Sequence, residues 1–371
     1  MTRKFDVPAE ETGADAMSGV RLLDPAQFDG EVDGKPVRLF TLRNSRGMVA
    51  CVTNYGAKIE QILVPDRDGN FGDVVLGYGS LAAAIHGSPS MGAFIGRYAG
   101  RIGNARFSLK GTEYRLQANN GRHCLHGGAR GSRFRVFDAV QRSASSVEMR
   151  YVFADGEEGF PGALALRLAY SVSEDNELVL DYDAVALNRP TVASFTTHAF
   201  FNLDGEASGS ALGHEVMIRA DRYFAMDAEL IATGELLPVD NTPFDFRQPT
   251  VLSELADAYD CCHLVNRSAQ EGLALCARVR AAVSGRVMEV WSTEPALQFY
   301  TGLAPLEALP GGPGKSGQRY LQQQGLCFEP QAYPNAPNCP AFPSSVYEPG
   351  KSRAGMTVYR FVAPAGFTAY R

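Results

Sequence analysis

Apolar and polar residues alternate along much of the chain, which is the pattern of β-strands with one buried face. The clearest run places apolar residues at every second position: Leu164, Leu166, Leu168, Tyr170 and Val172. The same period returns from Leu178 after a polar segment at residues 173–177, so the two runs predict a β-hairpin. Further strand-like runs lie at residues 37–41, 48–55, 147–153, 215–220, 273–281 and 287–292.

Helical patterns are scarce and predict only short helices at residues 81–86 and 253–258. Strands that follow one another without intervening helices predict antiparallel sheets, packed as a sandwich or barrel. The 38 glycines and 21 prolines agree with the many turns that such a fold needs. We expect a weakly ordered N-terminal tail at residues 1–20 and a single all-β domain at residues 21–371, in which Pro305–Gly317 forms a surface loop.

Composition excludes several classes of protein. The chain has 371 residues with 35 basic and 41 acidic side chains, scattered rather than clustered, which argues against nucleic-acid binding. It has no apolar run of the ~18 residues that a membrane-spanning helix needs, and its N-terminus lacks the apolar core of a secretory signal. Seven cysteines without a C-x-x-C pair argue against a disulfide framework and a zinc site. We therefore expect a cytoplasmic protein with reduced thiols.

Three residues stand in unusual surroundings. His126 lies in the glycine-rich segment NNGRHCLHGG, and His198 lies in the aromatic segment SFTTHAFFNL. Glu329 follows an apolar strand-like stretch in GLCFEPQ, where a carboxylate must be paired or its pKa rises. Each residue has a structural interpretation, as a hydrogen-bonded histidine or a buried ion pair. The functional interpretation is a general acid and a general base tuned toward neutral pH.

Short motifs in a fixed order extend this picture over roughly residues 30–365. They include NYGA at residues 54–57, VPDRDG at 64–69, GRYAGRI at 96–102, LHGG at 125–128, EGFPG at 158–162, TTHAFFNL at 196–203, TPFDFR at 242–247, QFYTG at 298–302 and EPQ at 329–331. Each motif alone is weak, but the ordered series resembles the aldose 1-epimerase, or galactose mutarotase, family.

The resemblance implies a large antiparallel β-sandwich with few short helices, the galactose mutarotase-like supersandwich. It also implies an activity, the interconversion of the α and β anomers of a free aldose, without a metal or redox cofactor. Carried over by motif, Glu329 corresponds to the general base and His198 to the general acid of the family. Arg97, His126 and Asp260 correspond to sugar-binding positions.

The implied chemistry suits these residue types. The anomeric hydroxyl must lose a proton while the ring oxygen gains one, so a carboxylate and a protonated imidazole can act together. A site of this kind predicts a rate that falls at both low and high pH. Phe200, Phe299 and Tyr300 are candidates to cover the apolar faces of a sugar, with ordinary core packing as the alternative.

Five positions depart from the pattern usual in the family, so the preferred sugar stays open between hexoses such as galactose or glucose and pentoses such as L-arabinose or xylose. The departures are Gly100 for Asn, Thr197 for Asn, Phe200 for Tyr, Cys261 for His and Asn335 for Asp. Two other functions compete: a sugar-phosphate epimerase and a non-catalytic sugar-binding module. The expected partner is a monosaccharide, bound by a monomer or homodimer, with no nucleic acid or membrane involved.

Overall fold

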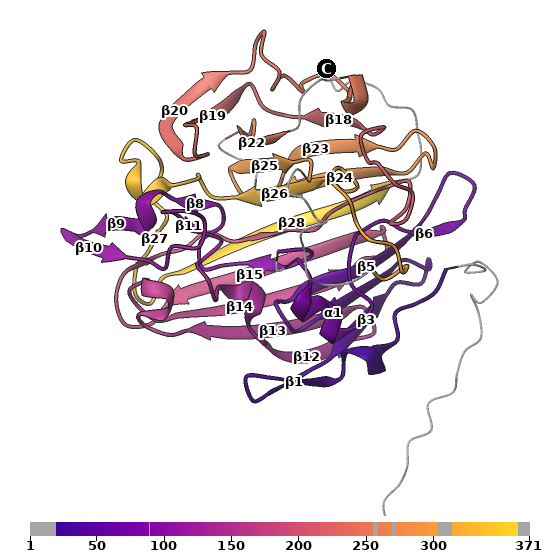
Figure 1. Ribbon diagram of the computed structural model, residues 1–371, viewed down its shortest axis with the longest axis horizontal. Coiled ribbons are helices and arrows are strands. Elements are labelled where there is room, and N and C mark those ends of the chain that lie inside the picture. The colour runs from indigo at the N-terminus through magenta and orange to yellow at the C-terminus, as the bar shows by residue number, and fades with distance from the viewer. Residues whose placement is uncertain (1–19, 89, 255–258, 269–271, 303–313, 363–371) are drawn as a thin grey trace, which may run out of the picture.

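The computed structural model describes residues 20–88, 90–254, 259–268, 272–302 and 314–362 (Figure 1). Apart from residue 20, the predicted N-terminal tail lies outside the described residues. The same holds for most of the predicted helix at 253–258 and for most of the predicted loop Pro305–Gly317.

Nine antiparallel strands form the largest sheet, in the order β12-β13-β14-β15-β28-β24-β23-β18-β21. In that order they span Asp138–Ser143, Ser146–Phe153, Leu164–Val172, Glu177–Ala186, Ser352–Val362, Val287–Ser292, Ala274–Arg280, Glu215–Ile218 and Thr250–Val251. Strand β28 pairs with β15 on one side and β24 on the other, so the C-terminal strand joins the two halves of the sheet (Figure 1).

Two smaller antiparallel sheets accompany the large one. The four-stranded sheet contains β3 (Leu39–Arg43), β4 (Val49–Thr53), β5 (Lys58–Pro65) and β6 (Phe71–Asp73). The five-stranded sheet has the order β20 (Ala232–Pro238), β19 (Arg222–Met226), β22 (Asp260–Leu264), β25 (Ala296–Tyr300) and β26 (Cys327–Gln331).

Short strand pairs and a few helical turns complete the described fold. The pairs are β1 (Gly30–Val32) with β2 (Lys35–Val37), β7 (Phe94–Ile95) with β17 (Thr196–Thr197), β8 (Arg101–Ile102) with β11 (Cys124–Leu125), β9 (Arg106–Leu109) with β10 (Thr112–Arg115), and β16 (Thr191–Val192) with β27 (Val346–Tyr347). Helix α1 (Leu81–His86) matches the predicted helix at 81–86. The 3-10 turns are η2 (Pro25–Phe28), η3 (Gly103–Ala105), η4 (Ser132–Phe134), η5 (Glu157–Gly159), η6 (Leu252–Glu254) and η8 (Ala336–Asn338). Within the described ranges, no helix has the length and apolar character that crossing a membrane requires.

A continuous hydrophobic core lies between the large sheet and the two smaller ones. Buried side chains from all three sheets belong to one cluster, including Val52 of β4, Leu168 of β14 and Phe328 of β26. The Tyr359 hydroxyl of β28 donates a hydrogen bond to the carbonyl of Phe328 at 3.1 Å, which ties the large sheet directly to the five-stranded sheet. Sheets packed face to face over one core form a sandwich, so the predicted antiparallel all-β class is confirmed.

The β14–β15 hairpin shows why the alternating pattern identified strands. Burial alternates residue by residue along both strands, with the even-numbered residues of each facing the core. The strands pair in register from Val172 opposite Leu178, and Asn176 takes a left-handed φ of 57° in the turn. The predicted strand at 37–41 is instead two strands in different sheets. The break falls at Arg38, whose backbone N–H donates to Oδ1 of Asn54 at 2.8 Å.

The alternation predicts opposite outcomes for two neighbouring positions of β14. Leu168 is fully buried, so Leu168→Ala should lower the free energy of unfolding by about 2–5 kcal/mol through lost burial and a residual cavity. Ser171 lies on the other face and is only partly buried, so Ser171→Ala should change it by less than about 0.5 kcal/mol. Urea unfolding followed by circular dichroism measures both. Equal effects would contradict the assigned faces.

Candidate active site

A cavity of about 330 Å³ opens beside the five-stranded sheet, where the β8–β11 pair and the segment that follows β17 approach it. It brings together four of the five predicted site residues: His126, His198, Asp260 and Glu329. These residues are up to 203 positions apart in the chain, so only the packing of the sheets gathers them.

Two strands of the five-stranded sheet, β22 and β26, supply the carboxylates, and β25 between them supplies an amide. Glu329 lies at the centre of β26, directly opposite Gln298 of β25, and Asp260 opens β22 opposite Tyr300. Gln298 donates from Nε2 to Oδ1 of Asp260 at 2.6 Å, which orients that carboxylate beside Glu329. Strand alternation points Cys327, Glu329 and Gln331 to one face of β26. Two strongly polar side chains therefore enter the cavity from one strand.

His198 is held immediately after β17 by both its backbone and its ring. Its N–H donates to the carbonyl of Ala93 at 2.8 Å, and its carbonyl accepts from Gly92 at 2.9 Å. The ring stacks on Phe200 with centroids 5.1 Å apart and meets Tyr300 edge-on at 6.2 Å. Phe200 and Tyr300 thus line the cavity, as the sequence suggested.

Phe299, the third aromatic candidate, belongs to the core. It is fully buried and stacks on Phe328 at 5.2 Å. Strand alternation explains the difference, because Phe299 lies between two residues that face the cavity, Gln298 and Tyr300.

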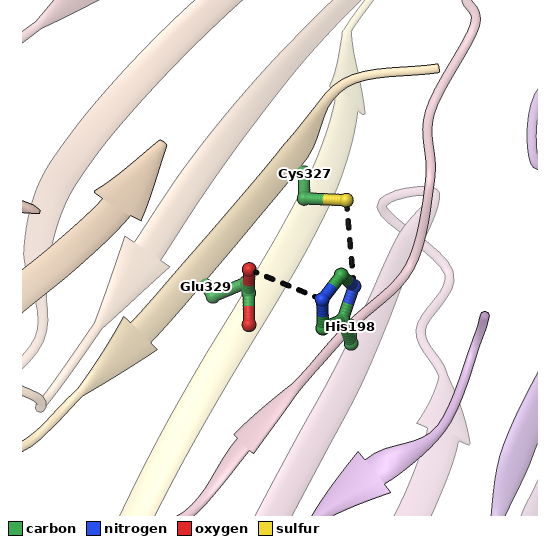
Figure 2. A group of neighbouring side chains, drawn as sticks. All are labelled: His198, Cys327 and Glu329. Atoms are coloured by element: carbon green, nitrogen blue, oxygen red, sulfur yellow. Dashed lines mark hydrogen bonds and ion pairs between the residues drawn. The ribbon is translucent and has the colours of Figure 1, made fainter. Parts of the chain in front are cut away.

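His198 and Glu329 contact each other directly. Nε2 of His198 lies 3.6 Å from Oε1 of Glu329, and Nδ1 lies 3.5 Å from Sγ of Cys327 (Figure 2). Burial raises the pKa of Glu329 well above its usual value, and the charge of Asp260 adds to this, while Arg101 opposes it.

Burial lowers the pKa of His198 to about 4; a hydrogen bond to its own backbone opposes this, and the cations Arg133 and Lys58 lower the pKa further. The imidazole of the free protein is therefore neutral near pH 7. Burial therefore acts against the protonated imidazole expected from the sequence, because desolvation disfavours the charged form of a base. A proton on one ring nitrogen still makes a neutral imidazole a hydrogen-bond donor and electrophile.

His126 projects from a tight turn after β11. The turn needs glycine at Gly127, which has φ of 79° and whose added Cβ would lie 2.3 Å from the carbonyl oxygen of Gly96. Nδ1 of His126 accepts from the backbone N–H of Gly100 at 3.3 Å, and burial lowers its pKa well below the usual value. The neutral ring therefore carries its proton on Nε2. The ring lies edge-on to that of His198, with the two centroids 5.4 Å apart.

Arg97, the predicted sugar-binding arginine, does not line the cavity. Its side chain is buried, with the guanidinium over the rings of Phe153 at 5.6 Å and Phe160 at 5.8 Å, and it donates to the carbonyl of Gly162. Nε and Nη1 have no hydrogen-bond partner among the described residues. The guanidinium is stabilised by aromatic faces instead, so Arg97 lies away from the cavity that holds the other four predicted site residues.

Arg101, four residues later, occupies the cavity instead. It opens β8, its Nε donates to Oδ1 of Asn120 at 3.0 Å, and its charge acts on both Asp260 and Glu329. The signal was present in the sequence, because the motif GRYAGRI contains both arginines. Sequence reasoning also missed Gln298 and Gln331, although both lie in the motifs QFYTG and EPQ.

Of the five departures from the family pattern, only Gly100 and Phe200 line the cavity. Asn335 has a structural role: it accepts from the Gly103 N–H at 3.0 Å and donates to the Ala232 carbonyl at 3.1 Å. Cys261 is buried in the main core, and Thr197 is buried in β17. The departures at the cavity are therefore two: Gly100, which has no side chain, and Phe200, which lacks the hydroxyl of a tyrosine.

His198, Cys327 and Glu329 also offer ligand atoms within 4.8 Å of one another, close enough to consider a metal site. The histidine, however, faces the thiol with Nδ1 and the carboxylate with Nε2 (Figure 2). A metal ion uses one nitrogen of a histidine, so these contacts do not converge on one point. The arrangement is a chain of hydrogen-bonding groups rather than a coordination sphere.

A carboxylate and an imidazole therefore lie in contact at the wall of one cavity, on an antiparallel β-sandwich. Comparison with known proteins gives the class. The family model described as aldose 1-epimerase matches residues 38–360. A galactose mutarotase of Sus scrofa is 39% identical over 320 residues, covering 84% of this chain and 90% of the pig protein. An aldose 1-epimerase of Escherichia coli strain K12 is 34% identical over 342 residues, covering 89% of this chain and 97% of the bacterial protein.

Solved structures of aldose epimerases share the fold of this chain. A homologue of the aldose epimerases from C. elegans superposes with a TM-score of 0.81 at 27% identity, covering 87% of this chain and 98% of that one. A galactose 1-epimerase from Lactobacillus acidophilus shares the fold, with a TM-score of 0.76 at 23% identity over 90% of this chain and 96% of that one. The chain belongs to the aldose 1-epimerase family. It is an enzyme of the carbohydrate epimerase class.

The two arginines predict a clear contrast. Arg101→Met should lower kcat/KM for anomer exchange by roughly 10- to 100-fold, the effect of losing a charged hydrogen bond. Arg97→Met should leave kcat/KM of the folded protein within about 3-fold, because its guanidinium points into the core. Polarimetry of the purified variants, with thermal unfolding as the control for folding, measures both. A larger loss for Arg97→Met than for Arg101→Met would restore the original assignment.

Proposed function

We propose that the protein interconverts the α and β anomers of a free aldose by opening and closing the sugar ring, with Glu329 as general base and His198 as general acid. The observation that carries the proposal is their contact, 3.6 Å between Nε2 and Oε1, at the wall of one cavity. The anomeric hydroxyl and the ring oxygen are bonded to the same carbon. A base and an acid that serve both must therefore be neighbours.

The reaction moves one proton off the sugar and another onto it. The carboxylate of Glu329 takes the proton of the anomeric hydroxyl while Nε2–H of His198 donates to the ring oxygen, and the bond from C1 to the ring oxygen breaks. Rotation about C1–C2 turns the aldehyde. Reclosure reverses the proton transfers on the other face, returning both side chains to their first state.

The remaining polar groups of the cavity suit the hydroxyls of a sugar. Arg101 supplies donors, Asp260 accepts, and Gln298 does both. His126 offers Nε2–H, because Gly100 already donates to Nδ1. The rings of Phe200 and Tyr300 suit the apolar face of a pyranose.

A free aldose is the best-supported substrate class. Among the described residues that line the cavity, Arg101 is the only lysine or arginine, which gives little to bind a phosphate. A non-catalytic sugar-binding module has no need of a buried carboxylate beside an imidazole. Several relatives at 38–39% identity are named galactose mutarotases, so hexoses are the first substrates to test and pentoses the second.

All seven cysteines are buried free thiols, which supports the proposal of a reducing, cytoplasmic compartment.

Removing either proposed catalytic group should nearly abolish turnover. Glu329→Gln and His198→Asn should each lower kcat by roughly 10²- to 10⁴-fold, the usual contribution of acid–base catalysis. Polarimetry of freshly dissolved α-galactose, α-glucose, α-xylose and L-arabinose, corrected for spontaneous exchange, measures the rate. Glu289→Gln is a matched control, because Glu289 is also buried but pairs with Arg278 in the large sheet. Undiminished activity in Glu329→Gln would remove it as the base.

The pH profile should have one titrating limb. A base must be ionised to act. Because the pKa of Glu329 is raised, kcat/KM should begin to fall at a pH well above 4.5 as the solution is acidified. Since His198 acts as a neutral imidazole, its titration near pH 4 gives no loss at high pH. The fall on both sides expected from the sequence therefore becomes a rise to a plateau. A loss of kcat/KM at high pH in the wild-type enzyme would contradict this.

Removing the charge of Asp260 should move the acidic limb of the pH profile in a defined direction. Its negative charge raises the pKa of Glu329, so Asp260→Asn should move the acidic limb to lower pH. Sugar binding should weaken at the same time, which appears in KM and not in the position of the limb. An unmoved or upward-shifted limb would show that another group titrates.

A further inference from the structure

Strand geometry places a thiol beside the proposed acid. Cys327 and Glu329 are two residues apart on β26, so their side chains point to the same face of the strand. The imidazole of His198 lies against both, with Nδ1 3.5 Å from the sulfur and Nε2 3.6 Å from the carboxylate (Figure 2). Each ring nitrogen thus has a different partner from the same strand.

The ring is fixed in this orientation. Phe200 stacks on it with an interplanar angle of 21°, while Tyr300 and His126 meet it edge-on at 79° and 80°. The backbone N–H and carbonyl of His198 are fixed by hydrogen bonds to Ala93 and Gly92, respectively. A ring enclosed in this way keeps Nδ1 toward the thiol and Nε2 toward the carboxylate.

The partners decide where the ring proton lies. An ionised carboxylate only accepts hydrogen bonds, so Nε2 faces Glu329 with N–H when Glu329 is ready to act as base. Burial keeps the imidazole neutral, which leaves a lone pair on Nδ1. Burial, together with the charge of Glu329, raises the pKa of Cys327 well above its usual value, so the thiol keeps its hydrogen and can donate it.

We propose that Cys327 is a positioning residue for catalysis, whose S–H donates to Nδ1 of His198 and holds the tautomer that presents Nε2–H to the sugar. The proposal rests on the proposed function of His198 as the acid. It gives a role to a cysteine that the reaction scheme above does not use.

The contact should matter most in the transition state. As Nε2–H is shared with the ring oxygen of the sugar, negative charge builds on the imidazole and Nδ1 becomes a stronger acceptor. The hydrogen bond from the thiol of Cys327 to Nδ1 then strengthens, while the contacts between the protein and the rest of the sugar stay the same. An interaction that is stronger in the transition state changes kcat rather than KM.

Nuclear magnetic resonance can observe the tautomer directly. In protein labelled with ¹⁵N-histidine, the His198 signals are identified by their loss in His198→Asn, above the pH at which activity reaches its plateau. We expect Nε2 to carry the proton and Nδ1 to be unprotonated in the wild type. Cys327→Ala should increase the share of the Nδ1–H tautomer, and Cys327→Ser should retain Nε2–H. A wild-type His198 protonated on Nδ1 would overturn the proposal.

Kinetics provide the second readout. Cys327→Ala should lower kcat by roughly 2- to 12-fold, the value of one neutral hydrogen bond, with KM unchanged. Cys327→Ser, whose hydroxyl also donates, should recover most of the loss, and it serves alone if the alanine variant does not fold. Cys276→Ala is the matched control, because Cys276 is a fully buried cysteine of β23 that donates to the Ala274 carbonyl and does not line the cavity. Wild-type kcat and tautomer in Cys327→Ala would refute the proposal.

The two proposals fail in different ways. If the wild-type protein accelerates anomer exchange of no aldose, the proposed function is wrong, while the nitrogen signals still report whether the thiol sets the tautomer. If the wild-type enzyme is active and His198→Asn is inactive, but the cysteine variants match the wild type in both readouts, only the role of Cys327 is wrong.

Discussion

Burial of the carboxylate of Glu329 is the constraint on which the site depends. A carboxylate 2% exposed to solvent loses most of its hydration, which is costly unless neighbouring groups compensate. Arg101 opposes the rise in its pKa and His198 lies in contact with it, while Asp260 raises it further. The balance leaves a carboxylate that holds its proton to an unusually high pH. That is the property a base needs to act near neutrality.

The sandwich makes this burial possible without breaking the core. Strand β26 has the main core on one side, where Phe328 packs, and the cavity on the other, where Glu329 and Gln331 lie. All five residues of β26 are consequently buried, and the strand shows none of the alternation between buried and exposed residues seen in β14. The same two-residue period that builds the core thus also aligns the thiol, the carboxylate and the amide of the site.

Much of the site was predictable because short motifs carry their own geometry. The turn around His126 depends on Gly127, and the strand around Glu329 is apolar on its core side, so both residues could be recognised locally. The choice between Arg97 and Arg101 could not be made in this way. Both lie in one motif. Only the path of the chain into β8 places Arg97 among the aromatic rings of the core and Arg101 at the cavity with the carboxylates.

The sequence by itself determined most of the long strands and the helix at residues 81–86, and its motifs named four residues that lie together at the cavity. Alternation of apolar side chains and the steric demands of turns are local properties, so they can be read along the chain. The tertiary structure alone decided that Arg101 faces the cavity, that Cys327 contacts His198, and that burial lowers the pKa of the imidazole. Desolvation and contact depend on which distant segments pack around a group, and no local pattern contains that information.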